Sequence, residues 1–319
     1  MLLTLSSLSF SSPFETCPTK AFLFQGNPTT VYGVNLVSGT DKILQDDVSN
    51  LSGTTSAGNV NGVGFDDYID DNGTSYRYLY GFNTTHRKFV RLDSDFKQTE
   101  LVVSNQPDGT FYVGDVYNRH YYFYRKNKGL YKINLDEAAE NYLVVQTIST
   151  SAPRNFTDFA FHPGNGKLYG IDNGTGILYE VITTTGATTS LLFTGEKGTF
   201  GAGYFDVNGY FYVSRNQDGK IYRIDLSTIG SVGDAPPYPA IEFAAGPLSG
   251  QNDGARCANA PLIDEDEKSN IDFGDAPDTY RSSLASNGAR HEIVEGGPYL
   301  GSIGPDGEVD ARLGILSDD

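Results

Sequence analysis

The sequence lacks the features that mark membrane-spanning and nucleic-acid-binding proteins. No apolar run approaches the roughly 20 residues that a transmembrane helix needs, so we expect no membrane insertion. The 23 lysine and arginine residues are outnumbered by 40 aspartate and glutamate residues, which gives a net charge of −17. Nucleic-acid binding requires a basic surface, and anionic membranes attract basic segments. The charge therefore argues against both partners and favours either bound cations or a plain, solubilising acidic surface.

Catalytic signatures are also missing from the sequence. It contains no phosphate-binding loop or dinucleotide fingerprint and no serine nucleophile elbow. The four histidines, His86, His120, His162 and His291, show no metal-ligand spacing. We expect each of them in a surface position or a loop. We therefore predict a protein that is not an enzyme.

Tryptophan is absent and methionine occurs once, whereas glycine occurs 37 times, tyrosine 21 times and phenylalanine 19 times. This composition suits strands and tight turns better than helices. One strand pattern recurs five times, with the apolar–polar alternation of a half-buried strand. Its copies are residues 31–36, 89–93, 130–135, 178–181 and 221–226.

Further strands flank every copy of this pattern. Aromatic strands precede the copies, over residues 22–25, 76–82, 121–125, 167–171 and 210–214. Third strands follow them, over residues 43–45, 99–103, 142–148, 189–193 and 240–243. Equivalent positions, Tyr32, Val90, Tyr131, Tyr179 and Tyr222, lie 58, 41, 48 and 43 residues apart. Repeats of about 40 to 50 residues with several strands each are typical of propeller blades.

The fourth strand of each unit predicts how the ring closes. Small-residue strands precede four of the units, over residues 62–65, 114–117, 158–161 and 201–204. The first unit lacks this strand, and the missing copy appears at the end of the array, over residues 253–256. A late strand that completes the first blade brings Cys257 beside Cys17, the only other cysteine. We predict an all-β, five-bladed propeller closed by this strand and a Cys17–Cys257 disulfide; the alternatives are a β-sandwich and two unrelated thiols.

The chain divides into four parts by composition. Residues 1–16 form an N-terminal arm or the remnant of a secretion signal. Their apolar stretch resembles the end of such a signal, but the basic region that begins a complete signal is missing. Residues 17–262 form the propeller, and residues 263–271 an acidic linker. Residues 272–319 form an acidic irregular segment, and the stretch from 264 onward carries 14 acidic and 4 basic residues. With so few apolar residues, this segment cannot bury a large core.

The C-terminal segment contains recognisable sequence motifs. DFGDAPDTY at 272–280 is followed by NGARH, PYLG and DGEVDA. These motifs resemble the start of the GEVED-type module of large bacterial surface and secreted proteins, and the module looks cut short. The preceding region, with CPTKAFLFQG and NDGARC, resembles an uncharacterised propeller-like domain that often precedes that motif. The resemblance implies a secreted or cell-surface location, but it names no ligand.

Carboxylates in this segment form a candidate metal site. One group recurs every three residues and the other alternates, which places the alternating group on one face if the chain is extended. Clustered carboxylates on a glycine-rich backbone suit Ca²⁺, which takes six to eight oxygen ligands. We predict Ca²⁺ here, with a plain acidic surface as the alternative. The residues are Asp272, Asp275, Asp278, Asp306, Glu308 and Asp310.

Three carboxylates, Asp115, Asp158 and Asp253, belong to the predicted inner strands. They can meet at the axis and hold an ion there, or they can simply cap strand ends and turns.

Tyrosines crowd one blade, at positions 117, 121, 122 and 124. Exposed rings can stack on sugars or anchor an interface. In alternating strands they pack between blades instead.

We predict an exported bacterial surface or matrix module that acts in adhesion, ligand binding or structural display without catalysis. Its expected partners are a carbohydrate, a surface protein or neighbouring copies of itself. One alternative is a metal-dependent hydrolase of the lactonase kind, which needs a metal and a base in the central channel. The other is a self-assembling filament or matrix subunit.

Overall fold

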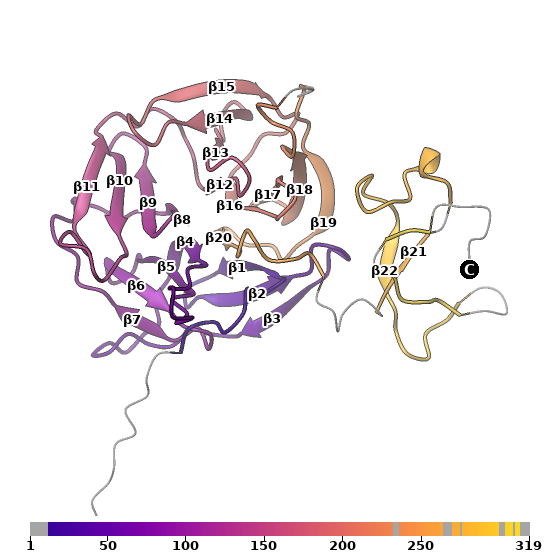
Figure 1. Ribbon diagram of the computed structural model, residues 1–319, viewed down its shortest axis with the longest axis horizontal. Coiled ribbons are helices and arrows are strands. Elements are labelled where there is room, and N and C mark those ends of the chain that lie inside the picture. The colour runs from indigo at the N-terminus through magenta and orange to yellow at the C-terminus, as the bar shows by residue number, and fades with distance from the viewer. Residues whose placement is uncertain are drawn as a thin grey trace, which may run out of the picture.

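The computed structural model describes residues 12–231, 236–263, 270–274, 276–299, 304–308 and 310–312. Five four-stranded antiparallel sheets are arranged around one axis, as the predicted propeller requires (Figure 1). From the axis outward, blade 1 contains β20 (Asn252–Ala255), β1 (Ala21–Gln25), β2 (Thr30–Val34) and β3 (Asp41–Gln45). Blade 2 contains β4 (Val60–Asp66), β5 (Tyr78–Asn83), β6 (Lys88–Leu92) and β7 (Gln98–Glu100).

The remaining blades repeat this order of strands. Blade 3 contains β8 (Val113–Tyr117), β9 (His120–Arg125), β10 (Gly129–Asn134) and β11 (Val145–Ser149). Blade 4 contains β12 (Phe159–Phe161), β13 (Leu168–Ile171), β14 (Ile177–Val181) and β15 (Thr188–Phe193). Blade 5 contains β16 (Phe200–Phe205), β17 (Tyr210–Arg215), β18 (Lys220–Asp225) and β19 (Ile241–Ala245). The inner strands contact one another around the ring, β4 with β8, then β12, β16 and β20, and β20 again with β4.

The ring closes as predicted. Strand β20 pairs antiparallel with β1, with Phe24 opposite Asp253. The disulfide between Cys17 and Cys257 lies beside this pairing, spans 240 residues of sequence and has a Cα–Cα distance of 5.6 Å. The late strand is therefore part of blade 1, and the disulfide covalently joins the two ends of the ring.

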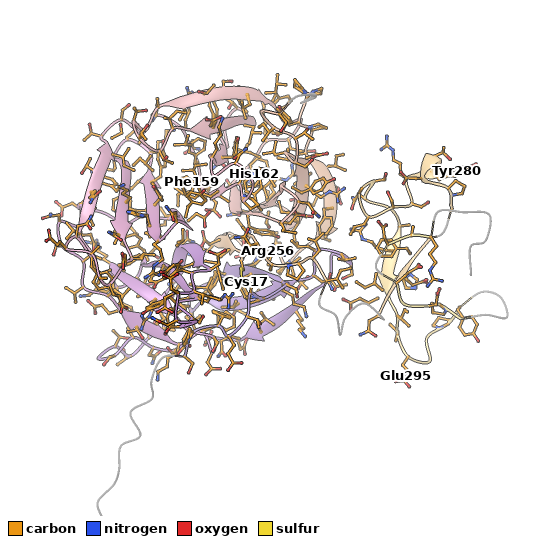
Figure 2. All side chains as sticks on the ribbon, viewed as in Figure 1. Cys17, Phe159, His162, Arg256, Tyr280 and Glu295 are labelled. Carbon is orange, nitrogen blue, oxygen red and sulfur yellow. A yellow bond between two sulfur atoms is a disulfide. The ribbon has the colours of Figure 1, made fainter. Side chains whose placement is uncertain are left out.

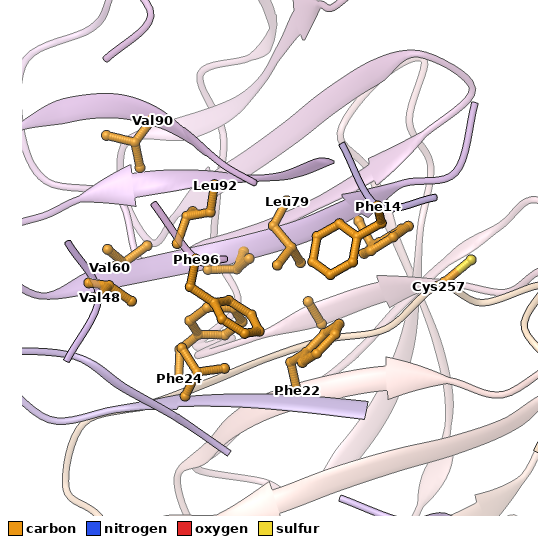
Figure 3. Close-up of a cluster of buried hydrophobic side chains, with 14 of the residues drawn as sticks. Phe14, Phe22, Phe24, Val48, Val60, Leu79, Val90, Leu92, Phe96 and Cys257 are labelled. Atoms are coloured by element: carbon orange, nitrogen blue, oxygen red, sulfur yellow. The ribbon is translucent and has the colours of Figure 1, made fainter. Parts of the chain in front are cut away.

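Each of the five hydrophobic cores of the propeller lies between two neighbouring blades. Between blades 1 and 2, the rings of Phe22 and Phe24 pack against Val60 and Leu79 (Figure 3). Phe14 from the N-terminal arm joins this cluster, which attaches the described part of the arm to the propeller. The other four cores lie between blades 2 and 3, 3 and 4, 4 and 5, and 5 and 1. Alternating aromatic and aliphatic residues thus face adjacent blades, which explains the composition.

His162 lies in the turn between β12 and β13, a loop position as expected, but its burial was not predicted. His162 is buried, with 5% of its surface exposed. Its Nδ1 accepts hydrogen bonds from the backbone N–H groups of Gly164 and Asn165, and its Nε2 donates to the carbonyl of Leu226 at 3.1 Å. The imidazole therefore fastens the turn between two strands to the neighbouring blade.

The C-terminal segment contains a small sheet beside the disc, next to β3 and β19 (Figure 1). Strands β21 (Ile271–Phe273) and β22 (Arg290–Glu292) pair antiparallel, and a 3-10 helix, η1, covers Asp278–Tyr280. Ile271 and Phe273 pack with Val37 of the propeller. Arg223 of β18 donates hydrogen bonds to the carbonyls of Leu284 and Ala285. No helix of the described residues is long and apolar enough to cross a membrane.

Candidate functional site

The inner-strand carboxylates connect neighbouring blades. Oδ2 of Asp253 in blade 1 accepts a hydrogen bond from the backbone N–H of Val63 in blade 2 at 2.5 Å. Oδ2 of Asp115 in blade 3 accepts one from Phe161 in blade 4 at 2.8 Å. Oδ2 of Asp158 in blade 4 accepts one from a backbone N–H of blade 5 at 2.6 Å. Each carboxylate therefore fixes its blade to the next one.

Burial changes the titration of these carboxylates. It raises the pKa of Asp115 to about 7, although this residue is only partly buried. Burial, followed by repulsion from Asp253, raises the pKa of Asp158 well above its ordinary value. The pKa of Asp253 is likewise well above the ordinary value, first because of burial. Desolvation of this kind favours the protonated form of a carboxyl group.

A tyrosine completes the interior of the ring. The hydroxyl of Tyr121 donates a hydrogen bond to the carbonyl of Gly62 at 2.5 Å. Burial, and then the nearby carboxylates, raise the pKa of Tyr121 well above its ordinary value. The phenol therefore stays a hydrogen-bond donor that links blade 3 to blade 2.

The channel opens at the end where the inner strands begin. This opening has a volume of about 360 Å³. We call it the amide mouth, because side-chain amides and hydroxyls form most of its rim and none of its described lining residues is charged. Its lining residues are Asn27, Asn59, Asn61, Thr84, Thr85, Thr110, Tyr112, Thr157, Asn216, Gly250, Gln251 and Asn252.

Two of these amides are held in place by the protein. Asn59 donates to the carbonyl of Gly26 at 2.8 Å and accepts from the hydroxyl of Thr84 at 2.7 Å. Asn252 donates to the hydroxyl of Ser214 at 2.9 Å and accepts from Gln25 at 3.1 Å. Part of the rim is therefore rigid, because both ends of these amides have partners.

The opposite opening has a volume of about 300 Å³. We call it the acidic mouth, because Asp66, Asp67 and Asp115 line it together with Arg256. Arg119 forms an ion pair with Asp66 at 2.5 Å. The acidic mouth therefore differs in charge from the amide mouth, although both are built from the ends of the same inner strands.

Three carboxylates of the C-terminal segment form a separate cluster that can hold a metal ion. One oxygen each from Asp272, Asp306 and Glu308 lies within 4.8 Å of the other two. Asp272 and Glu308 are buried, and Oδ1 of Asp306 is buried without a hydrogen-bond donor. Arg312 approaches Asp306 at 3.6 Å and Glu308 at 3.4 Å, which balances part of their charge.

Two of the other predicted ligands, Asp278 and Asp310, do not join the cluster. Asp278 accepts hydrogen bonds from the backbone N–H of Ser283 and the hydroxyl of Ser286. Asp310 accepts one from the backbone N–H of Leu284 at 2.6 Å, so the alternating carboxylates do not all share one face. Asp275 lies outside the described residues.

The channel carboxylates are arranged differently. Among the described residues, Asp115, Asp158 and Asp253 do not form a set in which all three approach within 4.8 Å. Their positions are explained by contacts between blades, which sequence reasoning missed because it considered only turns and a shared ion.

The crowded tyrosines of blade 3 have different surroundings. Tyr121 and Tyr124 are buried and Tyr122 is partly buried, in contact with the cores between blades. Tyr117 is 39% exposed at the acidic mouth. Sequence reasoning overlooked Tyr112, which is 44% exposed at the amide mouth. The sequence could have indicated Tyr112, because it directly precedes an inner strand and therefore lies at one end of the channel.

Together, the blades and the closing strand define a five-bladed β-propeller with a disulfide at its closure. The chain belongs to the family described as Repeat of unknown function (DUF6923), whose model matches residues 22–259. This range runs from the first strand of the ring to just beyond its closing strand.

Solved structures with a similar fold differ widely in sequence. A chain of a nidogen–laminin complex is 11% identical, with a TM-score of 0.46 over 77% of this chain and 83% of that chain. A gluconolactonase from Xanthomonas campestris is 14% identical, with a TM-score of 0.42 over 72% of this chain and 78% of that chain. Virginiamycin B lyase from Staphylococcus aureus is 14% identical, with a TM-score of 0.37 over 71% of this chain and 70% of that chain. No curated protein matches the sequence. Likenesses at these scores carry no conclusion about function.

Proposed function

We propose that the chain is a non-catalytic binding module of an exported bacterial surface protein and that it holds its ligand at the amide mouth. The observation that carries this proposal is an uncharged opening of about 360 Å³, rimmed by amides and hydroxyls. Openings of this size, with a few placed polar groups, are suited to binding part of a ligand. The rim comes from loops and strand ends on a rigid disc, where binding residues commonly lie.

The disulfide supports an exported location. Disulfides persist in oxidising environments and are rare in the cytosol. Cys17 and Cys257 form one at the ring closure. The GEVED-type sequence motifs of residues 272–311 also support export, because they resemble motifs of large bacterial surface and secreted proteins.

A pair of arginine variants tests where the ligand binds. Gln251→Arg places a long charged side chain at the amide mouth, and Ala258→Arg does the same at the acidic mouth. The probes are purified cell-wall polysaccharides and purified matrix proteins, immobilised on a surface. We expect saturable binding that Gln251→Arg abolishes and Ala258→Arg leaves unchanged. Binding that survives in Gln251→Arg would contradict the proposed site.

A hydrolase of the lactonase kind is the second candidate, and Asp115 is the observation in its favour. This carboxylate lines the acidic mouth, and burial raises its pKa to about 7. A general base works best with a pKa near the operating pH. Turnover of a panel of lactones and esters, measured with added Ca²⁺, Mn²⁺ or Zn²⁺, decides between the candidates. We expect none above the spontaneous rate; turnover that Asp115→Asn removes would replace the binding proposal.

The carboxylate cluster is the Ca²⁺ site of this proposal. Three carboxylates supply oxygen ligands of the type that Ca²⁺ prefers. The guanidinium of Arg312 supplies the positive charge beside these carboxylates. The Arg312 side chain is 52% exposed, so it can move out of the cluster when Ca²⁺ binds. Size-exclusion chromatography in Ca²⁺ and in EDTA also tests self-assembly, and a dimer or larger species in Ca²⁺ alone would indicate that the C-terminal segment docks onto another copy.

A further inference from the structure

Two residues that line the amide mouth, Asn61 and Asn216, each have a buried amide oxygen that accepts no hydrogen bond, and Asn61 is the more buried of the two. Asn61 is buried, with 6% of its surface exposed, and its Oδ1 has no hydrogen-bond donor. It lines the mouth beside the fixed amides of Asn59 and Asn252. A buried polar group without a partner destabilises the folded protein, because it has lost its hydrogen bonds to water without replacing them. The protein therefore bears a cost at this position that a ligand can offset.

The backbone directs Asn61 towards the mouth. The pairing of β4 with β5 shifts register between Asn61 and Gly64. Gly62 has a φ of +63°, which other residues rarely adopt, and its carbonyl accepts the hydrogen bond from Tyr121. An irregularity of this kind re-aims a side chain at the rim of a sheet. The orientation of Asn61 is thus held by the ring itself.

An aromatic ring lies at the same mouth. Tyr112 is 44% exposed and directly precedes β8. The guanidinium of Arg125 is 5.9 Å from the centre of its ring, and Arg125 also donates to the carbonyl of Thr110 at 2.7 Å. The mouth therefore combines a flat aromatic surface with amides and hydroxyls, and none of its described lining residues carries a charge.

From this combination we infer that the ligand of the amide mouth is a neutral carbohydrate, an inference that rests on the proposed function. Each sugar hydroxyl is both a donor and an acceptor, and amide and hydroxyl side chains offer the same two roles. The apolar face of a sugar ring can lie on Tyr112, while its hydroxyls reach Asn61 and the threonines of the rim. The uncharged lining disfavours anionic and cationic sugars, because it supplies no opposite charge to replace their hydration.

Strand β8 offers a matched pair of tyrosines for the test. Tyr112 precedes the strand at the amide mouth, and Tyr117 ends it at the acidic mouth. The full chain is screened against an array of neutral, acidic and amino oligosaccharides, and isothermal titration calorimetry then measures the affinity for the best neutral ligand. We expect Tyr112→Ala to weaken binding about 10-fold or more, as for an aromatic anchor. Tyr112→Phe and Tyr117→Ala should keep the affinity.

A second variant separates a binding role from a structural one. Because Asn61 is buried with an unpaired oxygen, Asn61→Leu should leave the melting temperature unchanged or raise it. The same variant should lower the affinity for the neutral oligosaccharide about 10-fold. A variant that melts earlier without losing affinity would overturn the role of Asn61.

The outcomes also distinguish this inference from the proposal beneath it. If neutral oligosaccharides do not bind but another probe binds in a way that Gln251→Arg blocks, the mouth is a binding site and the carbohydrate inference is wrong. If charged sugars bind more tightly than neutral ones, the inference is also wrong. If Gln251→Arg affects no binding at all, the proposed function itself fails.

Discussion

Oδ2 of Asp253 accepts a hydrogen bond from the backbone N–H of Val63 at 2.5 Å, so the strand that closes blade 1 is fixed to blade 2. Asp115 and Asp158 make the same contact from blades 3 and 4. A carboxylate forms strong hydrogen bonds to backbone N–H groups. Burying three carboxylates at one axis is nevertheless costly when they are ionised. The channel therefore links pH to the stability of the ring.

We predict that the propeller is less stable at pH 8 than at pH 5. Burial raises the pKa of Asp158 and Asp253 above their values in the unfolded chain. At pH values between the unfolded-state pKa and the folded-state pKa of these groups, the folded state binds more protons than the unfolded state. The free energy of unfolding therefore falls as the pH rises. The expected loss is on the order of 1 to 3 kcal/mol, measured by urea denaturation at both pH values.

The variant Asp253→Asn tests the cause of this pH dependence. Its amide oxygen can still accept from Val63, and its NH₂ group takes the place of Oδ1, a buried atom without a donor. We expect it to raise stability at pH 8 and to reduce the difference between the two pH values. The exposed Asp46→Asn is the control and should change neither. A wild type that gains stability towards pH 8 would contradict the prediction.

Most of the fold could be predicted from the sequence because a propeller repeats one local pattern. The alternation in segments such as 221–226 reports which side of a strand is buried, and the spacing reports how strands group into blades. The displaced copy at 253–256 reveals the closure, and the disulfide follows from it. Both features are confirmed in the structure.

The contacts between blades could not be predicted in the same way. Nothing around Asp158 in the sequence indicates that its carboxylate binds Gly203, 45 residues away. His162 looks like a loop residue, but the carbonyl of Leu226 in the next blade explains its burial. Asp310 alternates with Glu308, yet neither of these two residues lies in a strand, and the alternation rule does not apply to them. Local patterns report strands, and these contacts depend on how separate sheets pack.

The disulfide should contribute strongly to stability. Cys17 and Cys257 enclose 240 residues, and a loop of that length loses much entropy in the unfolded chain. Reduction is expected to lower the free energy of unfolding by about 3 to 5 kcal/mol. Urea denaturation with and without dithiothreitol measures this loss. The double variant Cys17→Ser with Cys257→Ser should show the lower stability under both conditions; equal stability of wild type and variant without reductant would contradict the prediction.

Arg256 provides a second, non-covalent closure next to the disulfide (Figure 2). Its guanidinium is buried and donates only to backbone carbonyls, those of Thr19, Cys257, Ala258, Ala260 and Pro261. The side chain thus holds the start and the end of the ring together. Lysine offers three donors on a compact ammonium and cannot reproduce this planar fork.

We therefore predict that Arg256→Lys lowers the free energy of unfolding by about 3 kcal/mol, as when a buried charged group loses partners. The melting temperature should fall by about 2 to 4 °C for each kcal/mol in a domain of this size. Arg87→Lys, at an exposed position, is the control and should melt like the wild type. A melting temperature unchanged in Arg256→Lys would show that the disulfide alone maintains the closure.

The carboxylate cluster gives the last prediction, because Arg312 and a cation compete for the same oxygens. Arg312 lies 3.4 Å from Glu308 and 3.6 Å from Asp306. Glu308 also accepts a hydrogen bond from the backbone N–H of Phe273 at 3.1 Å, so its carboxylate is held in place. If the cluster takes Ca²⁺, the guanidinium must leave first.

Two variants with opposite effects follow from this competition. Arg312→Gln removes the competing charge and should tighten Ca²⁺ binding several-fold, whereas Glu308→Gln removes a ligand charge and should weaken it about 10-fold or more. Isothermal titration calorimetry with CaCl₂ measures both, and Mg²⁺ is the comparison ion because it demands a stricter octahedral geometry. Arg281→Gln, an exposed change outside the cluster, should leave the affinity unaltered. If Arg312→Gln and Glu308→Gln shift the affinity in the same direction, or neither shifts it, the cluster is an acidic surface that Arg312 neutralises and Ca²⁺ binds elsewhere or not at all.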